Sequence, residues 1–349
     1  MSDSRDEIEA TPKEVLLSVL VPARNEEDCI ADCLQSLAAQ SEDGFRLGQD
    51  WELILVDDGS TDKTRRIAEG FPDITIIDPG PPPKGWTGKA NALWKASKSA
   101  RGTWLLFTDA DTVHEPGDLL RAIHEAEKAG VGMLSYSPRQ ILKGFWQRAL
   151  MPLVFCELAL AYSPQKVSDP NSRLAAANGQ FLLIRRDVYI RIGGHEAVAD
   201  RVLEDVELAN LAKRGKFGLR FRYAPEAVAT RMYRSFSQMM EGWTKNLALL
   251  FGNCLTLAAW RVLDMVMLVG LPALALSLFY YRLAFWGLML VWLRTLWRFY
   301  SRVAKSNMPA RDCALAIFGL PLFAALLWRS WFHHTIKKSV AWKGREYRG

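Results

Sequence analysis

Short apolar runs alternate with helical patterns through the first 140 residues of this chain. The runs are "VLLSVLV" (15–21), "WELILV" (51–56), "ITII" (74–77), "TWLLF" (103–107) and "VGMLSY" (131–136), and helical patterns separate them at 26–39, 62–69, 88–100 and 116–129. Strands that alternate with helices are typical of βαβ units and a parallel sheet. We therefore predict an α/β fold, with a mostly parallel sheet and flanking helices, that binds its ligand at the carboxyl ends of the strands.

Acidic and small polar residues follow three of these runs. The first leads into "VPARNEED" (21–28), the second into "DDGSTD" (57–62) and the fourth into "TDADT" (108–112). Any one of them is explained by helix capping, because Asp, Ser and Thr are good N-caps. Carboxylates gathered on one sheet edge repel each other unless a cation or a donor-rich ligand lies among them. The pair Asp109 and Asp111 suits Mg²⁺ or Mn²⁺, which bridges to ligand phosphates.

A Pro/Gly-rich loop precedes one of the predicted helices. It reads "DPGPPPKGWTGKANAL" (78–93), and the helix is expected to begin near Gly88 and Lys89. A helix N-terminus with a Lys binds anions readily, although the stretch can also be a surface linker. The spacing of a Walker A loop is absent.

Six ordered motifs together resemble family 2 glycosyltransferases. They are "SVLVPARNEED", "ILVDDGSTD", "GKANAL", "LLFTDADT", "NGQFLLIRR" and "LEDVELA", which lie within residues 15–250. The resemblance implies a GT-A fold that binds a nucleotide-diphospho-sugar. Within the family, "PPPKGWTGKANAL" and the apolar C-terminal part resemble enzymes that glycosylate lipids, in the carotenoid, hopanoid-associated and ceramide glucosyltransferase-like groups.

The resemblance also implies roles for residues of the donor site. Pro22, Arg24 and Glu26 would line the nucleoside pocket, Asp58 would accept a hydrogen bond from the base, and Lys89 would lie near the phosphates. Asp109 and Asp111 match the DxD motif, with Asp111 as the direct metal ligand and Asp109 closer to the ribose or sugar. The Mg²⁺ or Mn²⁺ ion neutralises the diphosphate as it leaves.

A second acidic pair, Glu204 and Asp205, is expected to open a helix in "RVLEDVELA" (201–209). Acidic residues in a first helical turn are ordinary, because they interact well with the helix dipole. The resemblance, however, implies that Asp205 is the general base of an inverting displacement and takes the proton of the acceptor hydroxyl. Elements that flank the acceptor are expected at Gly179, Gln180 and His195, with His195 as a hydrogen-bonding wall.

The chain departs from the family at one motif. Processive members carry QxxRW, whereas the nearest stretch here is "QMMEGWTKN" (238–246), which keeps Trp243 but has Met239 and Gly242 in place of the Gln and Arg. Lys245, Arg231 or Arg234 would have to supply a positive charge near the diphosphate. This departure favours transfer of a single sugar to a lipid over polymer synthesis.

The C-terminal part is apolar and basic. From residue 250 onward thirteen Lys/Arg stand against three acidic residues, a net charge of +10, while the first 249 residues carry −4. We expect membrane spans at 262–281, 283–300 and 312–332, and an amphipathic interfacial helix at 144–162. Such a basic, apolar part suits anionic lipid, and no nucleic-acid partner is expected.

The expected layout has four parts. A disordered N-terminus (1–14) precedes the GT-A domain (15–250), a membrane domain of two to four apolar segments (251–336) and a basic cytosolic tail (337–349). The polar, acidic N-terminus is not expected to be a signal peptide, and five Cys without a CxxC pair favour a reducing compartment. The chain is therefore expected in the plasma (inner) membrane with a cytosolic catalytic domain. Whether the third segment crosses, or a crossing lies in the apolar run from Leu247, is left open.

Three functions fit these patterns. The leading one is a membrane-bound, inverting, metal-dependent enzyme that moves one sugar, from a UDP-hexose by resemblance, to a lipid hydroxyl or carboxyl at the cytosolic leaflet. The second is a polyisoprenyl-phosphate sugar transferase, whose phosphate acceptor needs no strong base. The third is a catalytically inactive GT-A scaffold at the membrane.

Overall fold

A computed structural model describes residues 15–40, 42, 44–342 and 345–348, so the expected disordered segment 1–14 lies outside the described residues. The chain forms two compact units. Unit 1 contains residues up to 138 and 175–229, and unit 2 contains 139–174 and 230 onward. The chain therefore leaves unit 1 at residue 138, contributes one segment to unit 2, and returns at residue 175.

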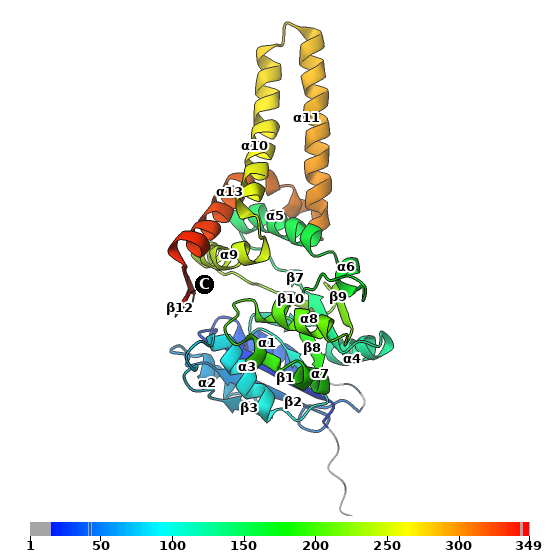
Figure 1. Ribbon diagram of the computed structural model, residues 1–349, viewed down its shortest axis with the longest axis vertical. Coiled ribbons are helices and arrows are strands. Elements are labelled where there is room, and N and C mark those ends of the chain that lie inside the picture. Colours follow the sequence, from blue (N-terminus) through cyan, green and yellow to red (C-terminus); the bar gives the residue numbers. More distant parts are fainter. Residues whose placement is uncertain (1–14, 41, 43, 343–344, 349) are drawn as a thin grey trace, which may run out of the picture. The chain divides into compact units, whose positions relative to one another are not determined.

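A seven-stranded sheet forms the centre of unit 1, in the order β3-β2-β1-β4-β8-β6-β9 (Figure 1). Its strands are β1 (Leu17–Ala23), β2 (Trp51–Asp57), β3 (Ile74–Ile77), β4 (Trp104–Phe107), β6 (Met133–Ser137), β8 (Leu182–Arg185) and β9 (Leu219–Tyr223). All neighbours pair in parallel except at β8, which runs antiparallel to both β4 and β6. The predicted mostly parallel α/β sheet is confirmed, and all five apolar runs form strands.

The helices of unit 1 pack their apolar sides on this sheet. They are α1 (Ile30–Ala38), α2 (Thr64–Ala68), α3 (Gly88–Ser99), α4 (Asp118–Lys128), α7 (Arg186–Arg191), η1 (Gly194–Val198) and α8 (Glu204–Arg214), and two short strands, β5 (Thr112–His114) and β10 (Val228–Thr230), complete the set. Ile30, Leu34 and Leu37 of α1 are fully buried in the same cluster as Leu53 and Leu106 of the strands. Burial of such side chains contributes about 1.5–3 kcal/mol each. The sheet edge that carries the predicted ligand residues is therefore held by a continuous core.

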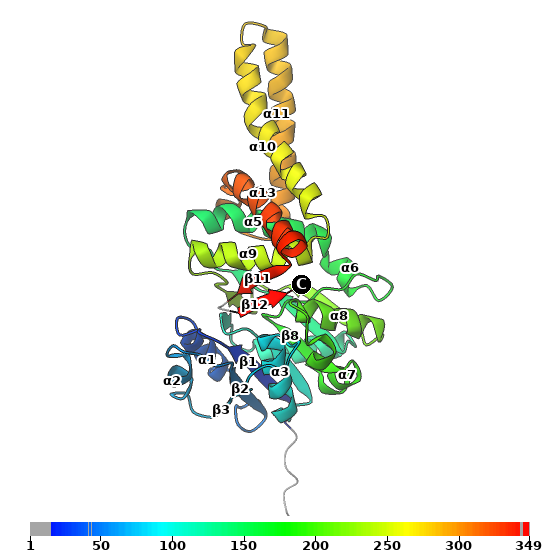
Figure 2. The ribbon, with the colours of Figure 1, turned by 60° about the vertical axis from the view of Figure 1, so that its left-hand side comes forward.

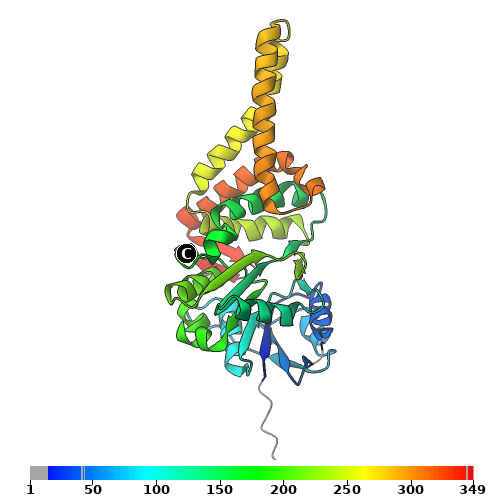
Figure 3. The same ribbon diagram turned by 90° about the vertical axis from the view of Figure 1, so that its right-hand side faces the viewer.

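Unit 2 is built from helices. They are α5 (Phe145–Ala161), α6 (Pro164–Ser168), α9 (Phe236–Leu250), α10 (Cys254–Ser277), α11 (Arg282–Val303), η2 (Ala304–Ser306), α12 (Ala310–Cys313), α13 (Ala316–Phe332) and η3 (His333–Lys337). The strand β7 (Arg139–Gln140) opens the unit, and an antiparallel pair, β11 (Ser339–Trp342) and β12 (Arg345–Arg348), closes it (Figure 2). α10 and α11 pack side by side as a long hairpin that rises from α5, α9 and α13 (Figure 1, Figure 3).

The predicted membrane segments all form helices, but only one is long and apolar enough to cross a bilayer. Within the described residues that helix is α10, and few of its side chains are buried. α11 has a lower mean hydropathy because Arg294 and Arg298 lie within it. α13 has 17 residues, a length of about 26 Å against the roughly 30 Å of a hydrocarbon core. The expected second and third spans therefore fall short of that criterion.

The first compact unit does not extend to residue 250, where the sequence placed the end of the GT-A domain. α5 and α9 belong to unit 2 because they bury their apolar faces in one cluster with α10 and α13. Residues 149–157 of α5, the helix expected at a membrane interface, are buried, and the exposed large apolar side chains of α5 are Phe145, Trp146 and Leu160. That α5 lies at a membrane interface stays a prediction.

Candidate functional site

The ends of β1 and β2 are joined by short hydrogen bonds. The Arg24 guanidinium donates to the backbone carbonyl of Asp58 (Nη1···O 2.8 Å), and the Asp58 amide donates to the Ala23 carbonyl (2.9 Å). Asp58 is buried, and Gly59 turns the chain with φ +70°, a conformation that favours glycine. Pro22, the last residue but one of β1, pairs with β2 in register. The structure thus brings Pro22, Arg24 and Asp58 together at the ends of β1 and β2.

The two loops that follow these strands interlock through backbone amides. Asn25 donates its amide to the Ser60 hydroxyl (3.1 Å), while its side-chain oxygen accepts from the Thr61 amide (2.8 Å). Next to it, the Glu26 amide donates to the Thr64 hydroxyl (2.8 Å). These contacts join residues 35 to 38 positions apart, so each loop holds the backbone of the other. The backbone of Glu26, which carries its carboxylate, is therefore held in place.

Helix α3 begins where the Pro/Gly-rich loop ends and places Lys89 in its first turn. The Thr87 hydroxyl caps the helix by accepting from the Ala90 amide (3.1 Å). Lys89 Nζ lies 2.8 Å from Asp109 Oδ1 and 3.0 Å from Glu204 Oε1. Burial acts to lower the pKa of Lys89, but the carboxylates around it outweigh burial and hold that pKa well above its usual range. Lys89 is therefore a fixed positive charge between two acidic motifs.

The DxD stretch follows β4 and leads through a turn into β5. Ala110 is buried in the core, whereas Asp109 and Asp111 are half-buried. The Thr112 hydroxyl donates to the Asp109 carbonyl (2.7 Å) and fixes the turn between them.

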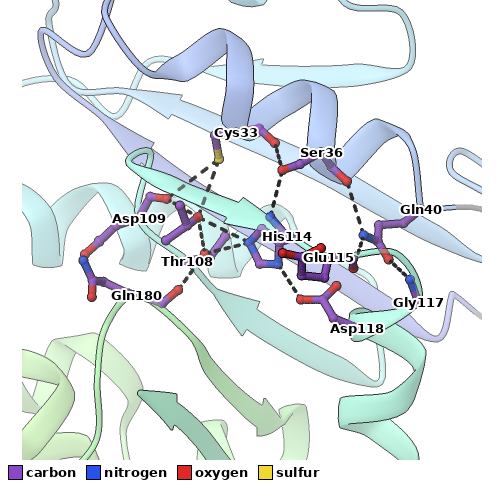
Figure 4. A network of polar contacts seen from close by, with 11 residues as sticks. Cys33, Ser36, Gln40, Thr108, Asp109, His114, Glu115, Gly117, Asp118 and Gln180 are labelled. Atoms are coloured by element: carbon purple, nitrogen blue, oxygen red, sulfur yellow. Dashed lines mark hydrogen bonds and ion pairs between the residues drawn. The ribbon is translucent and has the colours of Figure 1, made fainter. Parts of the chain in front are cut away.

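A buried polar network supports this turn from below (Figure 4). His114 Nδ1 lies 2.8 Å from Asp118 Oδ2, and its Nε2 lies 3.1 Å from the Thr108 hydroxyl and 3.3 Å from that of Thr112. The Thr108 hydroxyl donates to the Gln180 carbonyl (2.8 Å) and that of Thr112 to the Asp109 carbonyl. The network ties the DxD strand to the loop around Gln180.

Asp205 lies in the first turn of α8, and two backbone amides orient its carboxylate. Oδ2 accepts from the Gly179 amide (2.7 Å) and Oδ1 from the Val206 amide (2.8 Å). A Cβ at Gly179 would lie 3.0 Å from Lys89 Nζ and 3.3 Å from Asp205 Oδ2, so an added side chain would require these two groups to shift by a few tenths of an ångström. Burial and the neighbouring Glu204 raise the pKa of Asp205 to about 6, against the lowering effect of Lys89 and the two amides. Asp205 is thus mostly ionised at neutral pH but binds a proton just below it.

His195 forms part of the wall behind Lys89. Its Nδ1 lies 2.9 Å from the Tyr189 hydroxyl, which donates to the Ser97 hydroxyl (3.1 Å), and its ring packs edge-on against Phe107. Burial, together with the charge of Lys89, lowers the pKa of His195 to about 3. The ring is therefore neutral at physiological pH.

The structure gathers most of the predicted site in unit 1, but Trp243 and Lys245 belong to α9 of unit 2. The Trp243 indole is buried there against Phe155 and Tyr233 and donates to the Met151 sulfur (3.4 Å). The Lys245 carbonyl contacts His334 Nε2 at 2.8 Å. These contacts give Trp243 a packing role.

Several residues have structural roles at the site that were not predicted from the sequence. The hydroxyls of Thr108 and Thr112 and the pair His114 and Asp118 are buried beneath the DxD turn. The sequence shows only that His114 and Asp118 are four residues apart, and the structure places them at the end of β5 and at the start of α4.

The site offers a divalent cation two carboxylates. In the described part of the chain no three His, Cys, Asp or Glu side chains are grouped to hold a metal. Asp109 Oδ1 is engaged by Lys89, and Asp111 completes the pair. Mg²⁺ or Mn²⁺ shared with a ligand diphosphate typically uses one or two carboxylates and keeps waters, so the donor set fits an ion of this kind.

Comparisons with known proteins show the family of the chain and a shared fold. Residues 18–193 match the sequence profile described as Glycosyl transferase family 2. The chain is 26% identical over 345 residues to the 4,4'-diaponeurosporenoate glycosyltransferase of Staphylococcus aureus strain MRSA252, with 95% of this chain and 88% of that protein covered, and the same figures hold for strain USA300. Among solved structures, a mannosyltransferase from Pyrobaculum calidifontis in complex with GDP-Man and Mn²⁺ has a TM-score of 0.51 at 19% identity, covering 94% of this chain and 89% of that one, which shows a shared fold.

Proposed function

This chain belongs to glycosyl transferase family 2 and is a glycosyltransferase that uses a nucleotide sugar. On this premise we propose that it is a membrane-bound, inverting, metal-dependent enzyme that transfers one sugar from a nucleotide-diphospho-sugar, expected to be a UDP-hexose, to a lipid acceptor at the cytosolic leaflet. The observation that carries the proposal is the convergence of Lys89, Asp109, Glu204 and Asp205 at one edge of the sheet.

The donor binds along the ends of β1, β2 and β4. Pro22, Arg24 and Glu26 line the nucleoside pocket, and Asp58 accepts a hydrogen bond from the base. The rigid contact between the Arg24 guanidinium and the Asp58 carbonyl supports this assignment, because a preformed pocket lowers the ordering cost of binding. Lys89 lies at the diphosphate end, where its fixed charge attracts phosphate.

Asp111 and Asp109 would hold a Mg²⁺ or Mn²⁺ ion together with the donor. Bound there, the ion supplies positive charge to the diphosphate that leaves. The contact of Lys89 with Asp109 supports Asp111 as the direct ligand and Asp109 as the residue nearer the ribose or sugar. Lys89 adds a second positive charge next to the leaving group, where developing negative charge is most costly.

Asp205 is the general base for a hydroxyl acceptor. Its pKa of about 6 leaves it ionised at neutral pH yet basic enough to take a proton as the acceptor oxygen attacks the anomeric carbon. The Gly179 amide holds the carboxylate in place. Gln180, His195 and Glu204 enclose this region, with His195 as a neutral wall and Glu204 as the neighbour that raises the basicity of Asp205.

The acceptor is proposed to be a lipid with a hydroxyl or carboxyl group. The full-length similarity to an enzyme named for a carotenoid acid supports a long apolar acceptor. The exposed apolar surface of the α10–α11 hairpin supports attachment to the membrane in which such a lipid dissolves. A polyisoprenyl phosphate remains the alternative acceptor, and the base variant discussed below distinguishes it from a hydroxyl acceptor.

A donor screen on the full-length protein in detergent tests the proposal. Binding of UDP-, GDP- and dTDP-sugars is measured by calorimetry with and without Mn²⁺, for the native chain, Asp111→Ala and the exposed control Glu69→Ala. We expect metal-dependent binding of one donor that is lost in Asp111→Ala and kept in the control. If no donor binds to the folded protein, the proposal is refuted and the inactive scaffold is the function that remains.

A further inference from the structure

Helix α13 is apolar on two opposite sides. Its inner side, with Gly319, Leu320, Phe323, Leu326 and Leu327, is buried in unit 2. On its outer side Phe318, Pro321, Ala325 and Trp328 recur every three or four residues and are exposed, Phe318 by 58% and Trp328 by 55%. A helix on the surface of a soluble protein normally turns polar residues outward. The outer side of α13 therefore calls for an apolar environment.

Aromatic side chains of two other helices extend this surface. Phe145 at the start of α5 has its ring centroid 6.0 Å from that of Phe318, and Trp146 lies next to Phe145 at 5.1 Å. Phe236 of α9 lies 5.7 Å from Trp146, and all three of these added rings are 46% exposed. We call the whole set the outer face, namely Phe145, Trp146, Phe236, Phe318, Pro321, Ala325 and Trp328. Contiguous exposed apolar surface of this kind marks an interaction site.

Close packing fixes α13 along the other helices of unit 2. A Cβ at Gly319 would lie 2.1 Å from the Ala149 carbonyl oxygen of α5, so the two backbones touch. Near the other end, the Ser330 hydroxyl donates to the Thr244 carbonyl of α9 (2.7 Å) and accepts from the Ala248 amide (2.8 Å). α13 is thus anchored at both ends, and its length of about 26 Å is short for a crossing.

The charges around the outer face are positive. Residues 309–338 contain four Lys/Arg and one acidic residue, Asp312. The Asp312 carboxylate is buried and paired with Arg148 (3.2 Å) and with the exposed Arg311 (3.9 Å), and Arg329 is exposed as well. Aromatic side chains flanked by exposed cations suit the headgroup level of a bilayer with anionic lipid. The apolar hairpin of α10 and α11 belongs to the same unit, which favours a bilayer over a protein partner.

We propose that α13 lies in the plane of the membrane interface, with the outer face in contact with lipid, and does not cross the bilayer. This inference rests on the proposed attachment of the enzyme to a membrane. Because α10 and α11 form a hairpin, the chain enters and leaves the bilayer on one side. If α13 adds no crossing, the C-terminal strands β11 and β12 lie on that same side, in agreement with a cytosolic tail.

Depth measurements in lipid vesicles test the proposal. Single cysteines replace Phe318, Ala325, Val269 of α10 or Glu69 of unit 1 in the full-length protein, and each carries a nitroxide label in vesicles of phosphatidylcholine and phosphatidylglycerol. The five native cysteines are buried, and the unsubstituted chain measures their background labelling. Accessibility to oxygen and to a water-soluble nickel complex gives the depth of each label.

We expect the labels at 318 and 325 at nearly equal depth, about 5–10 Å into the boundary between headgroups and acyl chains. A crossing helix would instead separate them in depth by about 10 Å, the rise of seven helical residues, and that result would overturn the proposal. Water-exposed labels at both positions, with the Val269 label deep in lipid, would also overturn it. If the Val269 label is as exposed to water as the one at Glu69, the membrane attachment itself is refuted.

A protease site added after residue 349 gives a second test. In vesicles of one orientation, it is expected to be cleaved from the same side as a site placed before residue 1. Cleavage of the two sites from opposite sides would mean an odd number of crossings and would contradict an in-plane α13.

Discussion

Replacement of Asp205 by Asn separates the possible acceptors. The variant keeps the shape of the carboxylate but removes the base, and general-base catalysis typically contributes 10²–10⁴-fold to a rate, about 3–5 kcal/mol. For a hydroxyl acceptor we expect kcat to fall by that factor. A carboxylate or phosphate acceptor is already ionised at neutral pH, so less than a tenfold loss is expected there.

The pH profile gives an independent measure of the same group. With a pKa of about 6, Asp205 is roughly 90% ionised at pH 7 and roughly 10% at pH 5, so kcat/KM should fall about tenfold between them. In Asp205→Asn this acid limb should disappear. The raised pKa also means that ionisation of Asp205 destabilises the fold as pH rises from about 4 to 6, so the variant is not expected to unfold more easily at pH 7.

The assay follows transfer from a radiolabelled donor sugar to lipids of equal chain length that carry a hydroxyl, a carboxyl or a phosphate. Glu69→Gln serves as the matched control, because Glu69 is an exposed carboxylate whose partner is Arg65. The reasoning is refuted if Asp205→Asn keeps more than a tenth of the kcat with a hydroxyl acceptor, or if its pH profile still shows an acid limb near 6.

The remaining predictions concern the packing of charged and apolar parts. Gly179→Ala places a methyl group against Lys89 and Asp205, so we expect at least a tenfold loss of kcat without a fall in melting temperature. A melting temperature that falls together with kcat would point to misfolding instead. Lys89→Met removes the charge that lowers the pKa of the base, so the acid limb should move to higher pH and donor affinity should weaken about tenfold in calorimetry; an unmoved limb would contradict the assigned contact. Gly319→Val drives a side chain into the Ala149 backbone and should destabilise the protein by about 2 kcal/mol or more, seen as a lower melting temperature in detergent, and an unchanged value would contradict the close helix contact.

The sheet and its ligand edge were predictable from the sequence because both depend on local signals. Apolar runs of four to seven residues and the polar stretches after them define β1, β2 and β4, and Gly88 with Lys89 marks the start of α3. The antiparallel strand β8 was not predictable, since its short apolar stretch gives no direction. Direction depends on how the chain returns from unit 2 at residue 175.

The contacts that tune the site are not local, and the sequence therefore did not reveal them. Gly179 and Asp205 are 26 residues apart, and nothing in "NGQF" announces that its glycine amide binds a carboxylate. The role of α13 was obscured for another reason. Its composition is that of a membrane span, and only its contacts show that one apolar side is already buried. Hydropathy alone does not distinguish these two situations.

The path of the chain through the two units restricts how the enzyme can be shortened. α5 is encoded inside the segment that interrupts unit 1, whereas α9 and α13, which cover it, follow at the C-terminal end. A deletion that stops after residue 230 would keep α5 and strip the cover from Leu150, Val154 and their neighbours, which are fully buried in the complete protein. Such a fragment would expose the apolar side chains of α5 to water and would aggregate. A water-soluble catalytic fragment would need residues 139–174 excised and bridged by a linker as well.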